Sequence, residues 1–217
     1  MEQRSQSQKK RFRVFCASMS DVFEARRDLD VERQKLWNLI TAAPCLDWLL
    51  LTKRPEHASK LSPWCKDWPN NVWLGTSVEN QEWADIRLPQ ILAVPAKMRF
   101  LSCEPLLGPL NLSQHLEKGG IHWIIAGGES GPGSRPMHPN CVRKLRDFSN
   151  KNKIAFHFKQ WGNFTPVPPT SKQSQPLYVF TDQVKMIARN KVSNGRTIDG
   201  VTHDEFPALP QHNKGWS

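Results

Sequence analysis

The chain has 217 residues, of which 38% are hydrophobic, a formal net charge of +10 at pH 7 and a pI near 9.6. This length allows one main domain with a sizeable core and a small appendage. No apolar stretch approaches the roughly 20 residues that a membrane span needs, and no long apolar segment of a secretory signal follows the basic N-terminus. The composition therefore predicts a cytoplasmic protein without a membrane span.

The first elements in chain order are a basic arm and a series of apolar runs. Residues 1–11 are rich in Lys and Arg and are expected to form a disordered arm. From Phe12 onward, six short apolar runs each end abruptly in polar or charged residues: FRVFCAS, DWLLL, NVWLG, MRFLS, IHWIIAGG and IAFHF. Continuous apolar runs are typical of parallel strands that are buried on both faces. The six runs therefore predict six parallel strands.

Helical patterns separate these runs. The clearest covers residues 139–151, where Pro139 suits the first turn and Val142, Leu145 and Phe148 form the inward stripe. Another covers residues 81–94, with Trp83, Ile86 and other apolar residues at helical spacing. The alternation of strands and helices predicts an α/β fold, in which residues 12–162 form a partial (β/α) TIM-like barrel of about six parallel strands. A flat doubly wound sheet is the alternative.

The character of the chain changes after Trp161. Residues 163–217 begin with a Pro/Ser-rich stretch that reads as a linker, and short strands with turns at Asn194-Gly195 and Asp199-Gly200 follow. This region is expected to form a small C-terminal β appendage with a hairpin.

The cysteines and histidines give no sign of a metal centre. The five cysteines are well separated, and no CxxC or CxxxCxxC string occurs. Cys16 and Cys103 lie in or at the end of predicted strands, where a small buried side chain is the simpler interpretation. No two histidines show the spacing of metal ligands. The residues themselves therefore predict no metal site.

Polar residues at the ends of the predicted strands are the first candidates for a functional site, because ligands of α/β folds sit at the carboxyl ends of the strands. Alternate residues share a face, so Ser102 and Glu104 point one way on the fourth predicted strand, as Ser77 and Glu79 do on the third. If these faces point into a barrel, Glu79, Glu104, Lys159 of the sixth strand and one of Lys53 or Arg54 converge at its top. A site at the open end of the predicted barrel (the mouth) that holds both acidic and basic side chains suits a zwitterionic or phosphorylated small molecule. The structural alternative is that Glu104 and Lys159 only neutralise each other. The candidate ligand-binding residues are Ser18, Asp21, Lys53, Arg54, Ser77, Glu79, Ser102, Glu104, Gly127, Gly128, Glu129, Ser130, Arg135, Lys159, Gln160 and Trp161.

The string GGESGPGSRPMHP, residues 127–139, is the most specific local motif. Glycines directly after a strand let the backbone approach a ligand, and amides before a helix can hold an anion. The string is neither a GxGxxG fingerprint nor a Walker loop. A tight turn that needs positive φ is the structural alternative.

Several of these strings together resemble a known family. SMSDVFE, LLLTKRPE, NVWLGTSVEN, MRFLSCEPLLGPL, WIIAGGESGPGSRPMHP, FHFKQWGNF and NGRTIDGVTHDEFP are similar, in this order over residues 12–207, to a phage- and prophage-encoded family of unknown function. The resemblance implies a partial (β/α) barrel. It also implies that intact members open with three closely spaced cysteines, similar to the cluster-binding loop of radical S-adenosylmethionine enzymes.

The resemblance further implies that this chain is an N-terminally truncated member, because the three-cysteine segment is absent. An iron–sulfur cluster is then expected in intact members, while its cysteines are missing here. The retained mouth (Glu79, Glu104, Gly127, Gly128, Glu129 and Lys159) would bind S-adenosylmethionine or the substrate. A separate chain would supply the missing segment, and this chain alone would be inactive or half of a split enzyme.

Two other functions remain open at this point. The basic arm and the charge of +10 also suit a nucleic-acid-associated phage accessory protein. The strand-end residues also suit a cluster-independent barrel enzyme that acts on a phosphorylated or nucleotide substrate. The sequence assigns no catalytic residue in any of these cases.

Overall fold

The structure, a computed structural model, describes residues 13–16, 23–24, 29–167, 177–189 and 191–208. The predicted basic arm, residues 1–11, lies outside this part. Five strands form a parallel sheet: β2 (Asp47–Thr52), β3 (Val72–Ser77), β4 (Met98–Cys103), β5 (Trp123–Gly127) and β6 (Ala155–Gln160). The short β1 (Arg13–Cys16) pairs in parallel with β2 at the edge of this sheet. The prediction of an α/β fold with a parallel sheet is confirmed.

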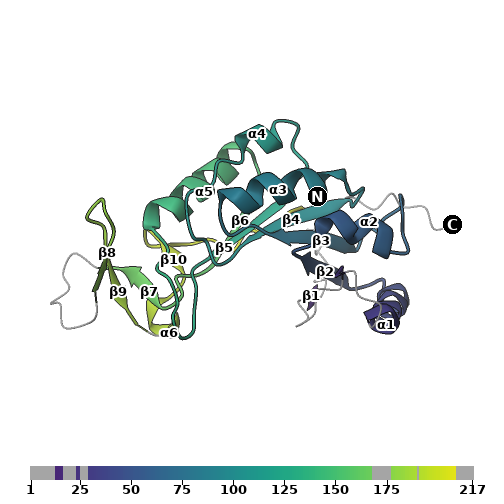
Figure 1. Ribbon diagram of the computed structural model, residues 1–217, viewed down its shortest axis with the longest axis horizontal. Helices are drawn as coiled ribbons and strands as arrows, with labels where there is room; N and C mark the ends of the chain where they lie inside the picture. Colours follow the sequence, from purple (N-terminus) through teal and green to yellow (C-terminus); the bar gives the residue numbers. More distant parts are fainter. Residues whose placement is uncertain (1–12, 17–22, 25–28, 168–176, 190, 209–217) are drawn as a thin grey trace, which may run out of the picture.

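The connections run between consecutive strands, so the sheet order follows the chain order from β1 to β6. They contain α1 (Asp30–Ala42), a 3₁₀ turn (Pro55–His57) with α2 (Ala58–Leu61), α3 (Gln81–Ala93), α4 (Ser113–Leu116) and α5 (Pro139–Lys151). Right-handed crossovers without a reversal of strand order place the helices on one face of a sheet. Figure 1 shows α3, α4 and α5 together on one side. The order among the described strands therefore differs from that of a doubly wound fold.

The two faces of the sheet carry different apolar layers. The helix-covered face contributes Leu74, Leu101 and Ile124 to the main core, together with the buried face of α5. The opposite face carries a smaller cluster of Leu49, Trp73, Met98, Phe100, Trp123 and Ile125, all buried. Alternation along each strand thus separates a helix face from an inner face, and Glu104 reaches Gly127 at the end of this inner face.

The sheet does not close into a barrel within the described residues. The C-terminal segment 203–205 runs antiparallel along β6: Phe158 N–H donates to the His203 carbonyl (2.9 Å), and Glu205 N–H donates to the Phe156 carbonyl (3.2 Å). This segment occupies the edge of β6 that a closing strand would need. The expected TIM-like barrel of six strands therefore has no support in the structure, because backbone groups that would close it are already paired.

The C-terminal region forms two small antiparallel sheets. One consists of β7 (Phe164–Pro166), β9 (Lys185–Ala188) and β8 (Leu177–Val179) in the order β7-β9-β8, and α6 (Lys191–Asn194) follows it. The other is the hairpin of β10 (Thr197–Ile198) and β11 (Val201–Thr202). Its turn has positive φ at Asp199 (53°) and Gly200 (81°), which is the conformation that two-residue hairpin loops prefer. Residues 168–176 of the expected linker lie outside the described part.

An ion-pair network joins this hairpin to α5. Asp199 accepts hydrogen bonds from Arg143 (Nη2 to Oδ1, 2.7 Å) and Arg146 (Nη1 to Oδ2, 2.9 Å). The hydrogen bonds from Arg143 and then Arg146 lower the pKa of Asp199 to about 2. Its side chain is 43% exposed, so solvent screens the network.

We expect Asp199→Asn to lower the free energy of unfolding by about 1 kcal/mol at pH 7, the upper range for partly exposed ion pairs. Because the native pKa of Asp199 lies below its ordinary value, this contribution is full above that ordinary value. It is lost as pH falls through the native pKa of about 2. Urea unfolding of both proteins at neutral and at acidic pH measures the difference. Asp67→Asn, at a carboxylate that is 95% exposed, is the matched control. Equal stability of Asp199→Asn and the parent at pH 7 would contradict the role of this network.

Within the described residues, no helix has both the length and the apolar character needed to cross a bilayer.

Candidate ligand site at the strand ends

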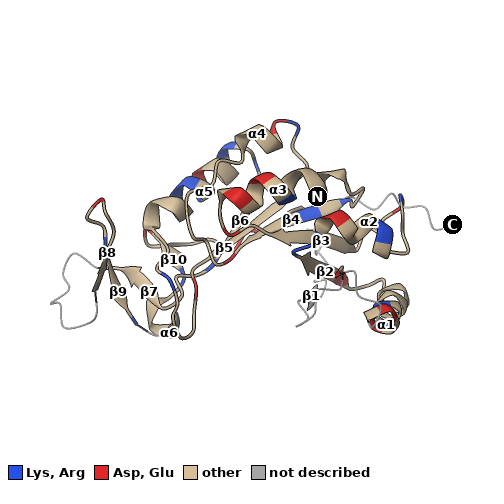
Figure 2. Cartoon of the chain, viewed as in Figure 1, with Lys and Arg blue, Asp and Glu red and all other residues tan. Residues whose placement is uncertain are grey.

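Two carboxylates follow adjacent strands at the carboxyl end of the sheet. Ser77 of β3 and Ser102 of β4 are register partners, and Glu79 and Glu104 each lie two residues further along the chain. Each carboxylate binds a lysine from another strand end: Lys53 Nζ lies 2.7 Å from Glu79 Oε1, and Lys159 Nζ lies 2.8 Å from Glu104 Oε2. The structure thus places two carboxylate–lysine pairs at the carboxyl ends of the parallel strands, of which only the pair of Glu104 and Lys159 was considered from the sequence. Figure 2 marks the acidic and basic positions along the described elements.

Arg87 of α3 forms a second, buried ion pair with the Glu79 carboxylate. Arg87 Nη1 donates to Glu79 Oε2 (2.9 Å) and to the carbonyl of Ser77 (2.8 Å), and its guanidinium lies 4.0 Å from the centre of the Trp83 ring. Glu79 is 7% and Arg87 5% exposed. Burial acts to raise the pKa of Glu79, but the hydrogen bond from Lys53 and the charges of Lys53 and Arg87 outweigh it and lower the pKa. Glu79 is therefore an ionised, oriented acceptor.

Sequence reasoning did not find Arg87. The residues that α3 buries are Ala84, Arg87, Leu88 and Ile91, which is the i, i+3, i+4, i+7 spacing of an inward stripe. An arginine inside such a stripe signals a buried anionic partner, because a buried charge needs pairing. Trp83 and Ile86, expected to face inward, are 37% and 44% exposed.

Glu104 is fixed by two neighbours on β6. In addition to Lys159, the Gln160 side-chain amide donates to Glu104 Oε1 (3.2 Å). Consecutive strand residues normally point to opposite faces, but the pairing of β5 and β6 shifts register between Ala126 and Gly127, where Phe158 and Gln160 are the successive partners. This bulge allows Lys159 and Gln160 to reach the same carboxylate. Gly127 leaves room for it, since a Cβ there would lie 3.3 Å from the Glu104 carboxyl carbon.

The glycine-rich loop after β5 crosses the chain after β6 at very short range. A Cβ on Gly128 would lie 1.9 Å from the Trp161 carbonyl oxygen, and one on Gly162 would lie 2.0 Å from the Glu129 carbonyl oxygen. Within the loop, Arg135 donates from Nε (2.8 Å) and Nη2 (2.7 Å) to the Glu129 carboxylate. The Arg135 side chain and backbone amide lower the pKa of Glu129 to about 2. These two charges neutralise each other inside the loop.

The remaining candidates divide by burial. Trp161 is 4% exposed and its indole N–H donates to the Thr197 carbonyl (2.9 Å), so this side chain anchors the appendage. Ser77 and Ser102 are buried, whereas Arg54 and Ser130 are exposed. Ser18 and Asp21 lie outside the described residues.

The cysteines that the structure describes do not come together. Cys45 and Cys65 are exposed, Cys103 and Cys141 are buried, and burial raises the pKa of the Cys103 thiol. Among the described residues there is no group of three or more His, Cys, Asp or Glu side chains that could hold a metal ion.

No curated protein and no solved structure matches the chain. A family model described as "protein of unknown function (DUF5131)" matches residues 2–207, nearly the whole chain. The chain belongs to this family.

Proposed function

We propose that the strand-end site binds a small zwitterionic molecule, with S-adenosylmethionine as the candidate ligand, and that the chain is the binding part of a radical-SAM-like enzyme. The observation that supports this proposal is the presence of two carboxylate–lysine pairs at the carboxyl ends of the parallel strands, with the two carboxylates following the adjacent strands β3 and β4. Ligands of α/β folds bind at this end of the sheet.

The two members of each pair differ in their exposure to solvent. Glu79 and Glu104 are mostly buried and are held by Arg87 and Gln160, while Lys53 and Lys159 are 61% and 55% exposed. An incoming ammonium group can replace a lysine at a fixed carboxylate, and the displaced lysine can then bind the carboxylate of the ligand. Each pair thus offers partners for both charges of an amino-acid moiety without leaving a charge unpaired.

The radical chemistry of such an enzyme would be supplied by an iron–sulfur cluster. The sequence holds no CxxC or CxxxCxxC string, and we propose that a separate chain carries the cluster. Reconstitution with iron and sulfide tests this point through absorption spectra. The chain alone is expected to remain without a stable cluster, and a stable four-iron cluster would contradict the split arrangement.

Calorimetric titration with S-adenosylmethionine tests the binding site. We expect the parent protein to bind, and Glu104→Gln to weaken binding at least tenfold, because a neutral amide loses the charge-assisted hydrogen bond, worth about 1.5–3 kcal/mol. Glu32→Gln, at an exposed carboxylate on α1, is the matched control and should bind as the parent does. Equal affinity of the parent and Glu104→Gln, or absence of binding to a folded parent protein, would contradict the proposal.

A further inference from the structure

A histidine lies on the inner face of the sheet, close to the strand-end site. Ser102, Ile125 and His157 are register partners across β4, β5 and β6, so their side chains point to the same face. Lys159, which binds Glu104, follows two residues after His157 on β6. Two strand residues rise by about 7 Å. The imidazole of His157 therefore lies one row of side chains away from the Glu104–Lys159 pair.

The imidazole of His157 lies between β5 and the C-terminal segment. The Trp123 ring meets it edge-on, at 5.9 Å between ring centres, and a β-bridge pairs His157 with Asp204. The His157 side chain is 19% exposed, and its Nδ1 lies 3.6 Å from Asp204 Oδ1, which also binds Arg196. Among the described residues no group forms a hydrogen bond with this buried Nδ1. A titratable ring thus has a fixed place beside the strand-end site.

The surroundings of His157 keep its imidazole neutral at pH 7. Burial, followed by the charges of Arg196 and Lys159, lowers the pKa of His157, whereas the charge of Glu104 acts to raise it. Asp204 offsets little of this effect, because it also binds Arg196. Protonation of the imidazole therefore takes place below the ordinary histidine pKa of about 6.5. It adds a cation one row away from the Glu104 carboxylate.

We propose that His157 makes ligand binding at the strand-end site dependent on pH: the neutral imidazole permits a cationic group to bind at Glu104, and the protonated imidazole weakens this binding. The inference rests on the proposed function of that site. The sulfonium and ammonium groups of S-adenosylmethionine outnumber its carboxylate, so an added cation near Glu104 repels the ligand. At the effective dielectric constant of about 20 that applies near a protein surface, a unit charge about 7 Å away changes the affinity about tenfold or more. The coupling is reciprocal, so the bound ligand also opposes protonation of His157.

Calorimetric titration with S-adenosylmethionine at pH 7 and at pH 5 tests the inference. We expect the parent protein to bind the ligand about tenfold more weakly at pH 5. In His157→Gln, whose side chain takes up no proton in this range, the difference between the two pH values should disappear. An unchanged circular dichroism spectrum of His157→Gln at both pH values shows that the variant is folded.

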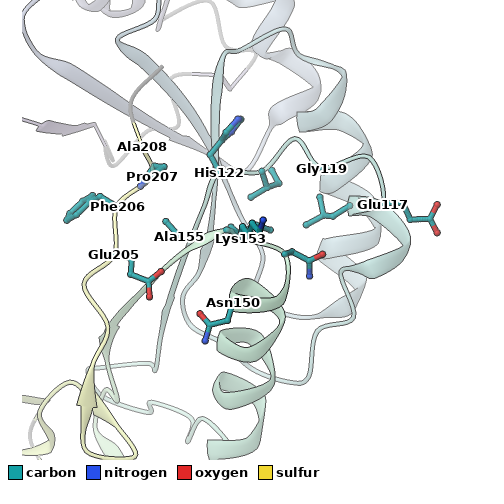
Figure 3. Close-up of a pocket in the computed structure, with 14 residues that line it drawn as sticks. Glu117, Gly119, His122, Asn150, Lys153, Ala155, Glu205, Phe206, Pro207 and Ala208 are labelled. Atoms are coloured by element: carbon teal, nitrogen blue, oxygen red, sulfur yellow. The ribbon is translucent and has the colours of Figure 1, made fainter. Parts of the chain in front are cut away.

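His122→Gln is the matched control. Burial lowers the pKa of His122 as well, but this residue lies at the opposite end of the sheet, where it lines a cavity of about 760 Å³ (Figure 3). The strand from His122 to Gly127 spans about 17 Å, which exceeds the Debye length of about 8 Å at physiological ionic strength. This variant should therefore keep the difference in affinity that the parent shows between pH 7 and pH 5.

NMR titration of the imidazole nitrogens of His157 measures the same coupling without a ligand. Glu104→Gln should lower the pH at which His157 becomes protonated, and Lys159→Met should raise it, because the two charges act on the imidazole in opposite directions. An unchanged titration of His157 in both variants would overturn the inference, and so would a pH dependence of binding in His157→Gln equal to that of the parent. Absence of S-adenosylmethionine binding to the parent, together with the expected NMR shifts, would support the coupling and contradict the proposed function.

Discussion

Gly128→Ala is expected to destabilise the chain by about 3 kcal/mol or more, at or above the upper end of the usual cost of overpacking. The new Cβ would lie 1.9 Å from the Trp161 carbonyl oxygen and 2.6 Å from its carbonyl carbon. Backbone atoms cannot swing aside as a flexible side chain can, so the ends of β5 and β6 would have to separate. The Gly128 N–H donates to the Gln160 carbonyl across this contact (2.9 Å), and separation would weaken this bond as well. Urea unfolding followed by tryptophan fluorescence measures the loss.

Gly108→Ala is the matched control for this prediction. A Cβ on Gly108 would meet nothing within 4 Å, so its stability should stay close to that of the parent. Gly162→Ala should behave as Gly128→Ala does, because its Cβ would lie 2.0 Å from the Glu129 carbonyl oxygen and its φ is 80°. If Gly128→Ala were nearly as stable as the parent, the loop at Gly128 and the segment at Trp161 would not lie as close together as the structure has them.

The parallel sheet was predictable because its signal is local. Apolar runs such as that around Leu49 are buried on both faces, and each run needs no information from the rest of the chain. The stripe of α5 is equally local, and Val142 and Leu145 are buried as expected. On α3 the apolar pattern did not identify Arg87 as a buried residue. Its burial depends on the ion pair with Glu79, which the spacing of apolar side chains does not reveal.

The failure of barrel closure could not be read from periodicity. It depends on residues 203–205 pairing with β6, a contact between positions almost fifty residues apart in the chain. Strand periodicity predicts which residues share a face but not which segment takes the last free edge of a sheet.

The candidate site was predictable to the extent that its residues follow strict alternation. Ser102 and Glu104 share the inner face as expected, and Lys159 meets Glu104 from β6. Trp161 lies beyond the register shift of β6, where alternation no longer gives the face of a side chain. Its indole therefore enters the core under the appendage, and the sequence carries no local signal for that bulge.

Arg87→Met is expected to lower the free energy of unfolding by about 3 kcal/mol at neutral pH, the lower end of the cost of breaking a buried ion pair. The change leaves Glu79, which is 7% exposed, with Lys53 as its cationic partner, and it leaves the Ser77 carbonyl without the Arg87 donor. Removing one cation raises the pKa of Glu79 towards or above its ordinary value. Urea unfolding from neutral to acidic pH measures the effect.

The pH dependence follows from the direction of the Glu79 shift. In the parent the native pKa is lowered, so the stability that ionised Glu79 contributes is full above the ordinary pKa and is lost as pH falls through the native value. The deficit of Arg87→Met should therefore be larger at neutral pH than at acidic pH. Adding Glu79→Gln should recover part of it, since no buried carboxylate then remains with an exposed lysine as its one cationic partner among those described above. Arg54→Met, at an exposed residue of the same strand end, should remain as stable as the parent. A deficit that does not change with pH, and that Glu79→Gln does not reduce, would show that Arg87 stabilises the fold through packing on Trp83 rather than through Glu79.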